Sequence, residues 1–173
     1  MTVARDPIAP AEFAGFCSAH HSRLVGALGL YCGDRAVGEE LAQETLARAW
    51  SQWTKVRDLE DPSGWLYRVG MNLANSYFRR KRAERRAQHR SLMPTEANED
   101  ATAILAIRDA VASLARRKRS VVVLRYYLGL PFAEIARVMD APESTVKSLA
   151  RRALEDLRGQ FTRADLTEAD YVY

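Results

Sequence analysis

The chain has 173 residues, of which 47% are apolar and 28% charged, a composition typical of one or two small folded domains and not of a disordered chain. No apolar run reaches the ~18 residues of a transmembrane helix, and the first ten residues lack the apolar core of a signal peptide. These features argue against membrane insertion and secretion, and we expect a cytoplasmic protein.

The net charge of +4 is distributed unevenly along the sequence. Residues 1–78 carry −2, residues 79–90 carry +6, residues 91–102 carry −3 and residues 103–173 carry +3. Two basic regions separated by an acidic stretch predict two contacts with a polyanion such as a nucleic acid.

Apolar residues recur at helical spacing along the N-terminal half, without the alternation of a strand. A first helix is predicted over about 10–30, with Gly29 and Gly33 marking the turn after it. A second helix begins near Asp34, a good N-cap. Its predicted buried stripe consists of Val37, Leu41, Leu46, Ala49, Trp50 and Trp53.

A polar stretch without periodicity, residues 54–61, precedes a third helix that opens at Asp61-Pro62 and continues into the basic run 79–82. The apolar face of this helix is predicted to contain Trp65, Leu66, Val69, Leu73 and Tyr77. We interpret Trp65 as a core residue and not as a stacking platform. Periodicity then fails in the acidic segment 91–102, which is a predicted flexible linker between domains.

The second half predicts a smaller helical domain over 103–158, followed by a tail at 159–173. Its expected helices are 104–114, 121–128, 131–139 and 143–157. A turn at Asp140-Ala141-Pro142 joins the last two, which is the arrangement of a helix-turn-helix. The fold class predicted for the whole chain is therefore all-α, with two small domains, 10–90 and 103–158, and a helix-turn-helix in the second.

The start of the last helix carries side chains that hydrogen-bond base edges and phosphates in a major groove. They are Glu143, Ser144, Thr145, Lys147, Ser148, Arg151 and Arg152. The basic run 116–119 is a second source of charge against a DNA backbone. The alternative from pattern alone is a helical hairpin with a solvated polar face.

Catalytic motifs are missing from the sequence: there is no Gly-rich phosphate loop, nucleophile elbow or His-Glu-x-x-His helix. Cys17 and Cys32 flank His20 and His21, but four zinc ligands normally come in closer pairs. We therefore expect no enzyme activity, no cofactor and no metal site.

Two parts of the sequence resemble two domains of one family, the bacterial RNA polymerase sigma factors. Leu114–Ala136 followed by Ser144–Ser148 closely resembles their promoter-binding C-terminal domain. Glu40–Trp50 is similar to their polymerase-docking helix, and Trp65–Asn75 to their promoter-melting helix. The matches come in the family's order over about 11–158, and no middle domain separates them, which is typical of the extracytoplasmic-function group.

The resemblance implies an alternative sigma factor that binds core RNA polymerase, recognises −35 and −10 promoter elements and melts the promoter. It implies contacts with the β′ clamp helices through Glu40, Gln43, Glu44 and Arg48. It implies −10 recognition and melting through Asn72, Asn75, Arg79, Arg80, Lys81 and Arg82, extended by Arg85 and Arg86. The loop 54–63 would receive a flipped base, and the residues listed above at 143–152 would read the −35 element. The expected partners are core polymerase (β′ clamp helices and β flap) and promoter DNA, with an anti-sigma protein left open.

Several points stay open at this stage. Many relatives carry a basic residue at the position of Leu149 and a His near Arg151, so the −35 preference is expected to differ. The linker 91–102 either threads the polymerase cleft or is a plain tether, and the tail 159–173 matches nothing in the common core. A plain helix-turn-helix regulator needs neither the Glu40–Trp50 helix nor the basic run 79–90. A sigma mimic, acting as a decoy for an anti-sigma protein, would be expected to lose its basic residues.

Overall fold

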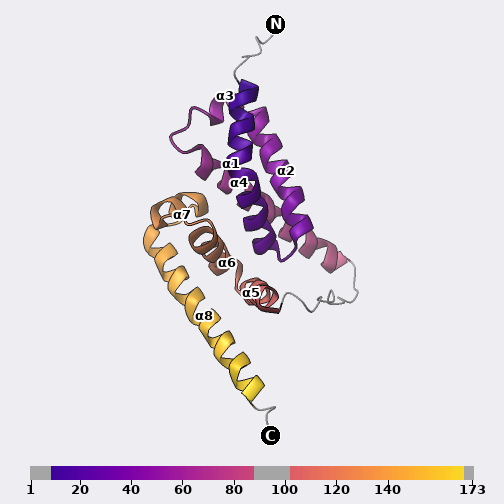
Figure 1. Cartoon of the computed structure of the whole chain (residues 1–173), viewed down its shortest axis with the longest axis vertical. Helices are drawn as coiled ribbons and strands as arrows, with labels where there is room; N and C mark the ends of the chain where they lie inside the picture. Colours follow the sequence, from indigo (N-terminus) through magenta and orange to yellow (C-terminus); the bar gives the residue numbers. More distant parts are fainter. Residues whose placement is uncertain (1–8, 88–101, 170–173) are drawn as a thin grey trace. The chain divides into compact units, whose positions relative to one another are not determined.

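The computed structural model describes residues 9–87 and 102–169, and within them the side chains of residues 10–84 and 106–161. These residues form helices and no strand, so the predicted all-α fold is confirmed. The chain divides into two compact units, residues 1–87 and 88–173, each a small helical bundle (Figure 1). Apart from Thr102, the predicted linker 91–102 lies outside the described residues.

The N-terminal unit contains α1 (Ala9–Cys32), α2 (Arg35–Ser51), the one-turn α3 (Trp53–Val56) and α4 (Pro62–Ala87). Figure 1 shows α1 and α2 side by side and running in opposite directions. The turn between them forms at Gly33, whose φ of 76° suits a residue without Cβ. Asp34 caps α2 as predicted, because its carboxylate accepts from the backbone N–H groups of Ala36 at 2.9 Å and Val37 at 3.3 Å.

Glycines set how closely these helices approach. A Cβ built on Gly38 of α2 would lie 2.4 Å from the backbone nitrogen of Gly29 and 3.0 Å from the carbonyl oxygen of Val25, both on α1. The prediction that Gly29 belongs to the turn is therefore wrong: it lies inside α1, at the crossing with α2. On α4, a Cβ at Gly70 would lie 3.2 Å from Leu24 and 3.4 Å from Thr45.

The buried faces differ in part from those predicted. On α2, Leu41 and Ala49 are buried as expected, but Trp50 is 48% exposed, and Val37 and Leu46 are only half-buried. The residues actually buried along α2 form one stripe, and Trp50 lies one position after its last member. They are Gly38, the adjacent pair Leu41 and Ala42, Thr45 and Ala49. Trp53 is buried, as predicted, but it belongs to α3.

The long helix α4 shows the same pattern. Leu66 and Leu73 are buried as predicted, whereas Trp65, Val69 and Tyr77 are half-buried. The inner face of α4 also includes Tyr67, Gly70, Met71 and Ala74. α4 begins with Asp61 as a cap, whose carboxylate accepts from the backbone N–H of Gly64 at 2.8 Å, as the Asp61-Pro62 pair predicts.

The C-terminal unit contains α5 (Thr102–Ser113), α6 (Arg116–Val122), a π-helical turn (Val123–Tyr127), α7 (Phe132–Met139) and α8 (Glu143–Ala169). Its core is built from the last three segments and α6: Leu124, Ile135, Val146 and Ala153 are essentially inaccessible to solvent. On α5, Ile107 is 53% exposed and Val111 is buried, and Leu114, directly after the helix, is buried too. α8 continues to Ala169, so the predicted helix end at Leu157 is wrong.

We expect Gly38→Ala to lower the free energy of unfolding of the N-terminal unit by about 1–3 kcal/mol, because the new Cβ overlaps the backbone of α1. Gly15→Ala is the control: it lies in α1 with nothing within 4 Å of its Cβ, and it should stabilise by up to about 1 kcal/mol. All three tryptophans (50, 53 and 65) lie in this unit, so urea unfolding followed by tryptophan fluorescence reports on it selectively. Equal effects of the two variants would contradict the tight crossing.

Candidate nucleic-acid interface

The exposed face at the start of α8 holds most of the residues predicted to contact DNA. Ser144, Lys147, Ser148 and Arg151 are exposed and recur at helical spacing, so they share one face. Glu143 and Arg152 are exposed beside that face, and Thr145 is half-buried. The helix-turn-helix therefore presents a polar surface that its own packing does not cover.

Both central cations on this face have partners on α8 itself. Nζ of Lys147 lies 2.7 Å from Oε1 of Glu143, and Nη1 of Arg151 lies 2.6 Å from Oε1 of Glu155. Each pair is one turn apart and exposed to solvent, so it contributes little stability and is screened by salt. A polyanion can therefore take over these cations at small cost.

The turn between α7 and α8 has the geometry of a helix C-cap. Asp140 adopts a left-handed conformation with φ of 49°, and the N–H of Ala141 donates to the carbonyl oxygen of Ala136 at 3.0 Å, as in a Schellman motif. The ring of Phe132 lies under two cations, 4.7 Å from the guanidinium carbon of Arg125 and 6.0 Å from Nζ of Lys147. The ring thus links the π-helical turn to the exposed face of α8.

The basic run 116–119 is only partly directed to solvent, unlike the prediction for it. Lys118 pairs with Asp156 of α8 at 2.6 Å. Arg119 is half-buried and donates to the carbonyl oxygens of Ala112 and Leu114, where it satisfies groups at the end of α5. Arg116 and Arg117 are exposed. Two of the four cations therefore hold the bundle together.

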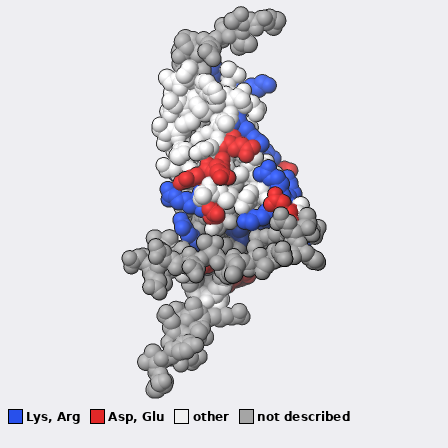
Figure 2. Space-filling view, turned by 90° about the vertical axis from the view of Figure 1, so that its right-hand side faces the viewer, with Lys and Arg blue, Asp and Glu red and all other residues white. Residues whose placement is uncertain are grey.

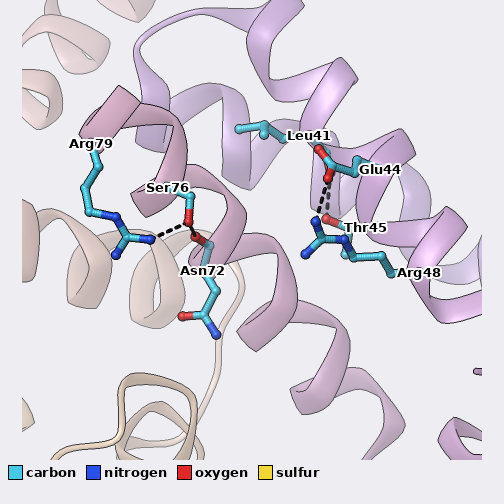
Figure 3. A network of polar contacts seen from close by, with 7 residues as sticks. All are labelled: Leu41, Glu44, Thr45, Arg48, Asn72, Ser76 and Arg79. Carbon is cyan, nitrogen blue, oxygen red and sulfur yellow. Dashed lines mark hydrogen bonds and ion pairs between the residues drawn. The ribbon is translucent and has the colours of Figure 1, made fainter. Parts of the chain in front are cut away.

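A second polar face lies on α4, in the other unit (Figure 3). Asn72 is exposed, and its amide points away from α2. One turn later, the hydroxyl of Ser76 donates to the carbonyl oxygen of Asn72 at 2.9 Å and accepts from Nη2 of Arg79 at 2.7 Å. The structure thereby brings Asn72 and Arg79, both predicted site residues, to one face of the helix.

The other predicted residues of α4 do not all share that face. Arg79, Arg80, Lys81 and Arg82 are exposed, but four consecutive residues turn through nearly a full helical turn. Lys81 donates to the hydroxyl of Tyr77 at 3.1 Å and lies over its ring. Asn75 is half-buried, and its amide oxygen accepts from the hydroxyl of the fully buried Tyr31 at 2.7 Å. The side chains of Arg85 and Arg86 lie outside the described residues.

The segment predicted as an irregular loop, 54–63, is helical at both ends. Its first end is held by contacts with α1, and its second end is the N-terminal cap of α4. It begins in α3, where Val56 is buried, and ends in the first turn of α4. Arg57 pairs with Glu12 of α1 at 3.1 Å, which anchors the start of the connection. Residues 58–60 are exposed between these anchors, and Leu59 is the apolar side chain among them.

The outer face of α2 carries the predicted polymerase-binding residues. Glu40, Gln43, Glu44 and Arg48 are all exposed, and Arg48 pairs with Glu44 at 2.7 Å (Figure 3). Trp50 lies two turns after Gln43 and so on the same face; its ring packs 5.0 Å from that of Phe13. Sequence periodicity missed it, although the seven-residue spacing from Gln43 was a usable signal.

Figure 2 shows that this side of the molecule is mixed in charge and not simply acidic. Red and blue side chains alternate in the middle of the view, and an area with few charged side chains covers the upper part, where α1 begins and α2 ends in Figure 1. A partner for α2 therefore meets paired charges as well as the half-exposed ring of Trp50.

Three neighbouring groups on α1 and α4 of the N-terminal unit have shifted pKa values: Cys17, His20 and Tyr67. Burial lowers the pKa of the His20 imidazole, and the charge of Arg23 lowers it further. The ring of His20 packs against Phe16, and its Nδ1 lies 3.4 Å from the hydroxyl of Tyr67, whose pKa is raised mainly by burial. Burial also raises the pKa of Cys17.

Within the described residues, His, Cys, Asp and Glu do not gather in groups of three or more that could hold a metal ion. None of the described helices has both the length and the apolar character needed to cross a membrane.

Two family descriptions match the chain, in order. "Sigma-70 region 2" matches residues 16–84, and "Sigma-70, region 4" matches residues 104–157. The chain is 29% identical to an RNA polymerase sigma-E factor of Streptomyces coelicolor, over 90% of this chain and 89% of that protein. It is 33% identical to the ECF RNA polymerase sigma factor SigL of Mycobacterium tuberculosis, over 73% of this chain and 75% of that protein.

Solved structures agree in fold. The sigma factor RpoE in complex with the anti-sigma factor NepR, from Bartonella quintana, has a TM-score of 0.76 at 19% identity and covers 87% of this chain and 97% of its own. CnrH in complex with the cytosolic domain of CnrY has a TM-score of 0.68 at 21% identity, covering 89% and 90%.

The lowered pKa of His20 predicts acid sensitivity of the N-terminal unit. Because the folded-state pKa lies below the unfolded value of about 6.5, the unfolded chain takes up the proton first. Stability is therefore present above this pH and is lost as the pH falls toward the folded-state pKa. We expect the urea midpoint, followed by tryptophan fluorescence, to fall between about pH 7.5 and about pH 5.5 more in the natural chain than in His20→Gln. An equal fall in both chains would show that other groups cause it.

Proposed function

The chain belongs to the sigma-70 family, among the ECF RNA polymerase sigma factors, and from this premise we propose which surfaces carry out each step of initiation. As an alternative sigma factor it directs promoter recognition and transcription initiation. Sigma factors bind core RNA polymerase and promoter DNA, and they are DNA-binding regulators and not classical enzymes. The assignment of individual surfaces rests on the exposed faces described above.

Core polymerase is proposed to bind the outer face of α2, through the β′ clamp helices. Glu40 and Gln43 are exposed there, and the pair Glu44–Arg48 presents both signs of charge. Charges of this kind orient an encounter more than they supply affinity. The half-exposed ring of Trp50 is the apolar group on this face whose burial contributes affinity.

The −10 element is proposed to meet the polar face of α4. The Asn72 amide can donate and accept, as reading a base edge requires, and Arg79 lies on the same face to contact the backbone. Arg80, Lys81 and Arg82 continue the cationic surface around the helix. For Asn75 the amide NH2 is the proposed contact with DNA, because the amide oxygen already accepts from the hydroxyl of Tyr31. The exposed residues 58–60 are the proposed receptor for a flipped base.

The −35 element is proposed to receive α8 in its major groove. Ser144, Lys147, Ser148 and Arg151 face the bases, with Glu143, Thr145 and Arg152 at the edges of the contact. The same unit is proposed to contact the β flap. Because one structure similar in fold is the sigma factor RpoE in complex with the anti-sigma factor NepR, an anti-sigma protein is a further proposed partner.

Melting is proposed to be driven by binding free energy, without a cofactor or nucleotide hydrolysis, and the protein is proposed to act in the cytoplasm. The observation that carries the assignment is that each unit keeps a polar, cationic helix face outside its own core. Transcription from a pooled promoter library, with purified bacterial core polymerase, tests it directly. Run-off products that depend on the protein are expected, and their absence despite binding of the protein to core polymerase would overturn the proposal.

For the −35 contact we expect Lys147→Ala combined with Arg151→Ala to weaken promoter binding by about 10- to 100-fold, since both lost cations contact bases or phosphates. Affinity for core polymerase should not change. Arg108→Ala, an exposed cation of α5 in the same unit, is the control and should leave promoter affinity within about twofold. Fluorescence anisotropy with labelled promoter and labelled core measures both affinities, and an equal loss of both would count against the assignment.

For the −10 contact we expect Asn72→Ala to lower the yield of open complex about tenfold, because one base-reading amide is lost. The −35 duplex should bind as before. Permanganate footprinting of unpaired thymines measures the open complex, and an unchanged yield would remove Asn72 from this role.

A further inference from the structure

A row of three polar side chains follows one face of α4, as Figure 3 shows. Asn72, Ser76 and Arg79 are separated by four and three residues, so they lie one above the other along the helix. Asn72 and Arg79 are exposed and Ser76 is half-buried between them. Ser76 bonds to both, at 2.9 Å to the Asn72 carbonyl oxygen and 2.7 Å to the Arg79 guanidinium.

The direction of these two bonds is fixed by the chemistry of a hydroxyl. It has one proton and two lone pairs, and the proton is used on the carbonyl oxygen of Asn72. The lone pairs are therefore left for Arg79, which has donors only. An exposed arginine samples many rotamers, and fixing it on a ligand costs conformational entropy. Ser76 restricts those rotamers before any ligand arrives.

A neutral partner also leaves the charge of Arg79 intact. In the same view Arg48 is paired with Glu44, so its charge is balanced by a carboxylate. Arg79 instead keeps its full positive charge while its orientation is restricted. A guanidinium has five N–H donors, so the bond to Ser76 leaves donors for phosphate oxygens.

We propose that Ser76 is a positioning residue for capture of the melted strand. It holds the guanidinium of Arg79 on the face of the Asn72 amide, so that a phosphate is bound next to the base that Asn72 contacts. Ser76 itself touches neither base nor phosphate. This inference rests on the proposed function, because it takes Asn72 and Arg79 as contacts of the non-template strand.

Ser113 offers a matched control in the other unit. Its hydroxyl also donates to a backbone carbonyl of the preceding turn, that of Ala110 at 2.7 Å, and accepts from the amide of Gln160 at 2.8 Å. Ser113→Ala therefore deletes the same bonding pattern at a position that we place outside the binding surfaces. Urea unfolding of every variant shows whether folding is retained.

The test measures binding of holoenzyme, assembled from core polymerase and the full chain, to a forked DNA probe. The probe has a duplex end and a single-stranded non-template tail of randomised sequence. Ser76→Ala, Ser76→Thr, Arg79→Ala and the double variant Ser76→Ala/Arg79→Ala are compared over a range of salt concentrations. Sequencing of the bound fraction reports which tail positions are selected.

We expect Ser76→Ala to weaken binding by about three- to tenfold, and Ser76→Thr, which keeps the hydroxyl, to stay within about twofold of the natural chain. Arg79→Ala should lower the slope of log K against log salt by about 0.7, the value for one single-strand phosphate contact. In the Arg79→Ala background, loss of the Ser76 hydroxyl should have no further effect. Ser113→Ala should bind as the natural chain does.

The possible results distinguish the proposed phosphate contact of Arg79 from the proposed positioning role of Ser76. If Arg79→Ala leaves affinity and salt slope unchanged, the proposed role of Arg79 fails, and the role of Ser76 fails with it. If Arg79→Ala weakens binding but Ser76→Ala does not, only the positioning role is overturned. An equal effect of Ser76→Ala with and without Arg79 would also overturn it, because Ser76 would then act on the strand or the fold by itself.

Discussion

The close crossing of α1 and α2 at Gly29 and Gly38 determines how the N-terminal unit presents its surfaces. Because a Cβ at Gly38 would meet backbone atoms, the two helices approach until their backbones touch. Gly70 lets α4 come close to Leu24 and Thr45 in the same way. Each helix therefore buries only a narrow stripe of side chains in the core, and its other side chains are at least partly exposed to solvent. On α2 the exposed side chains include the charged residues and Trp50, and on α4 they include Asn72 and Arg79.

The all-α class, the two units and the helix-turn-helix follow from periodicity, because apolar residues at intervals of three and four need little context to be read. Predicting which residues of an apolar stripe are buried requires tertiary information, since burial depends on where the neighbouring helix crosses. The sequence predicts Trp50 in the core because this residue is apolar. In the structure, however, the face of α2 that packs against α1 includes Thr45, a polar residue that is fully buried, and Trp50 lies outside it. The Thr45 hydroxyl donates to the carbonyl oxygen of Leu41 at 2.6 Å, a bond within the helix that makes this burial tolerable.

The same distinction, between what helical spacing predicts and what depends on tertiary contacts, applies to the candidate site. Helical spacing was enough to place Ser144, Lys147 and Arg151 on one face, because α8 is regular and its inner face is strongly apolar. Spacing gave no sign that Tyr31 bonds to Asn75 or that Arg119 is turned to the end of α5, because each contact joins segments that the sequence does not relate. The predicted end of α8 is wrong because the helix continues through Gly159, and a single glycine costs only about 1 kcal/mol in a helix.

The two faces proposed to bind DNA differ in how their cations are held. On α8 the partners of Lys147 and Arg151 are the carboxylates of Glu143 and Glu155, which balance part of the positive charge of this face and compete with phosphates for the two cations. On α4 the partner of Arg79 is a hydroxyl, and the charge remains. Non-specific attraction to DNA, which depends on net positive charge, is therefore weaker at the face proposed to read sequence than at the face proposed to hold a single strand. When α8 binds DNA, a phosphate replaces or competes with the carboxylate of Glu143 or Glu155, so the phosphate contact alone adds little free energy. Hydrogen bonds to matching bases therefore contribute a larger share of the affinity, and this favours specific sites over non-specific DNA.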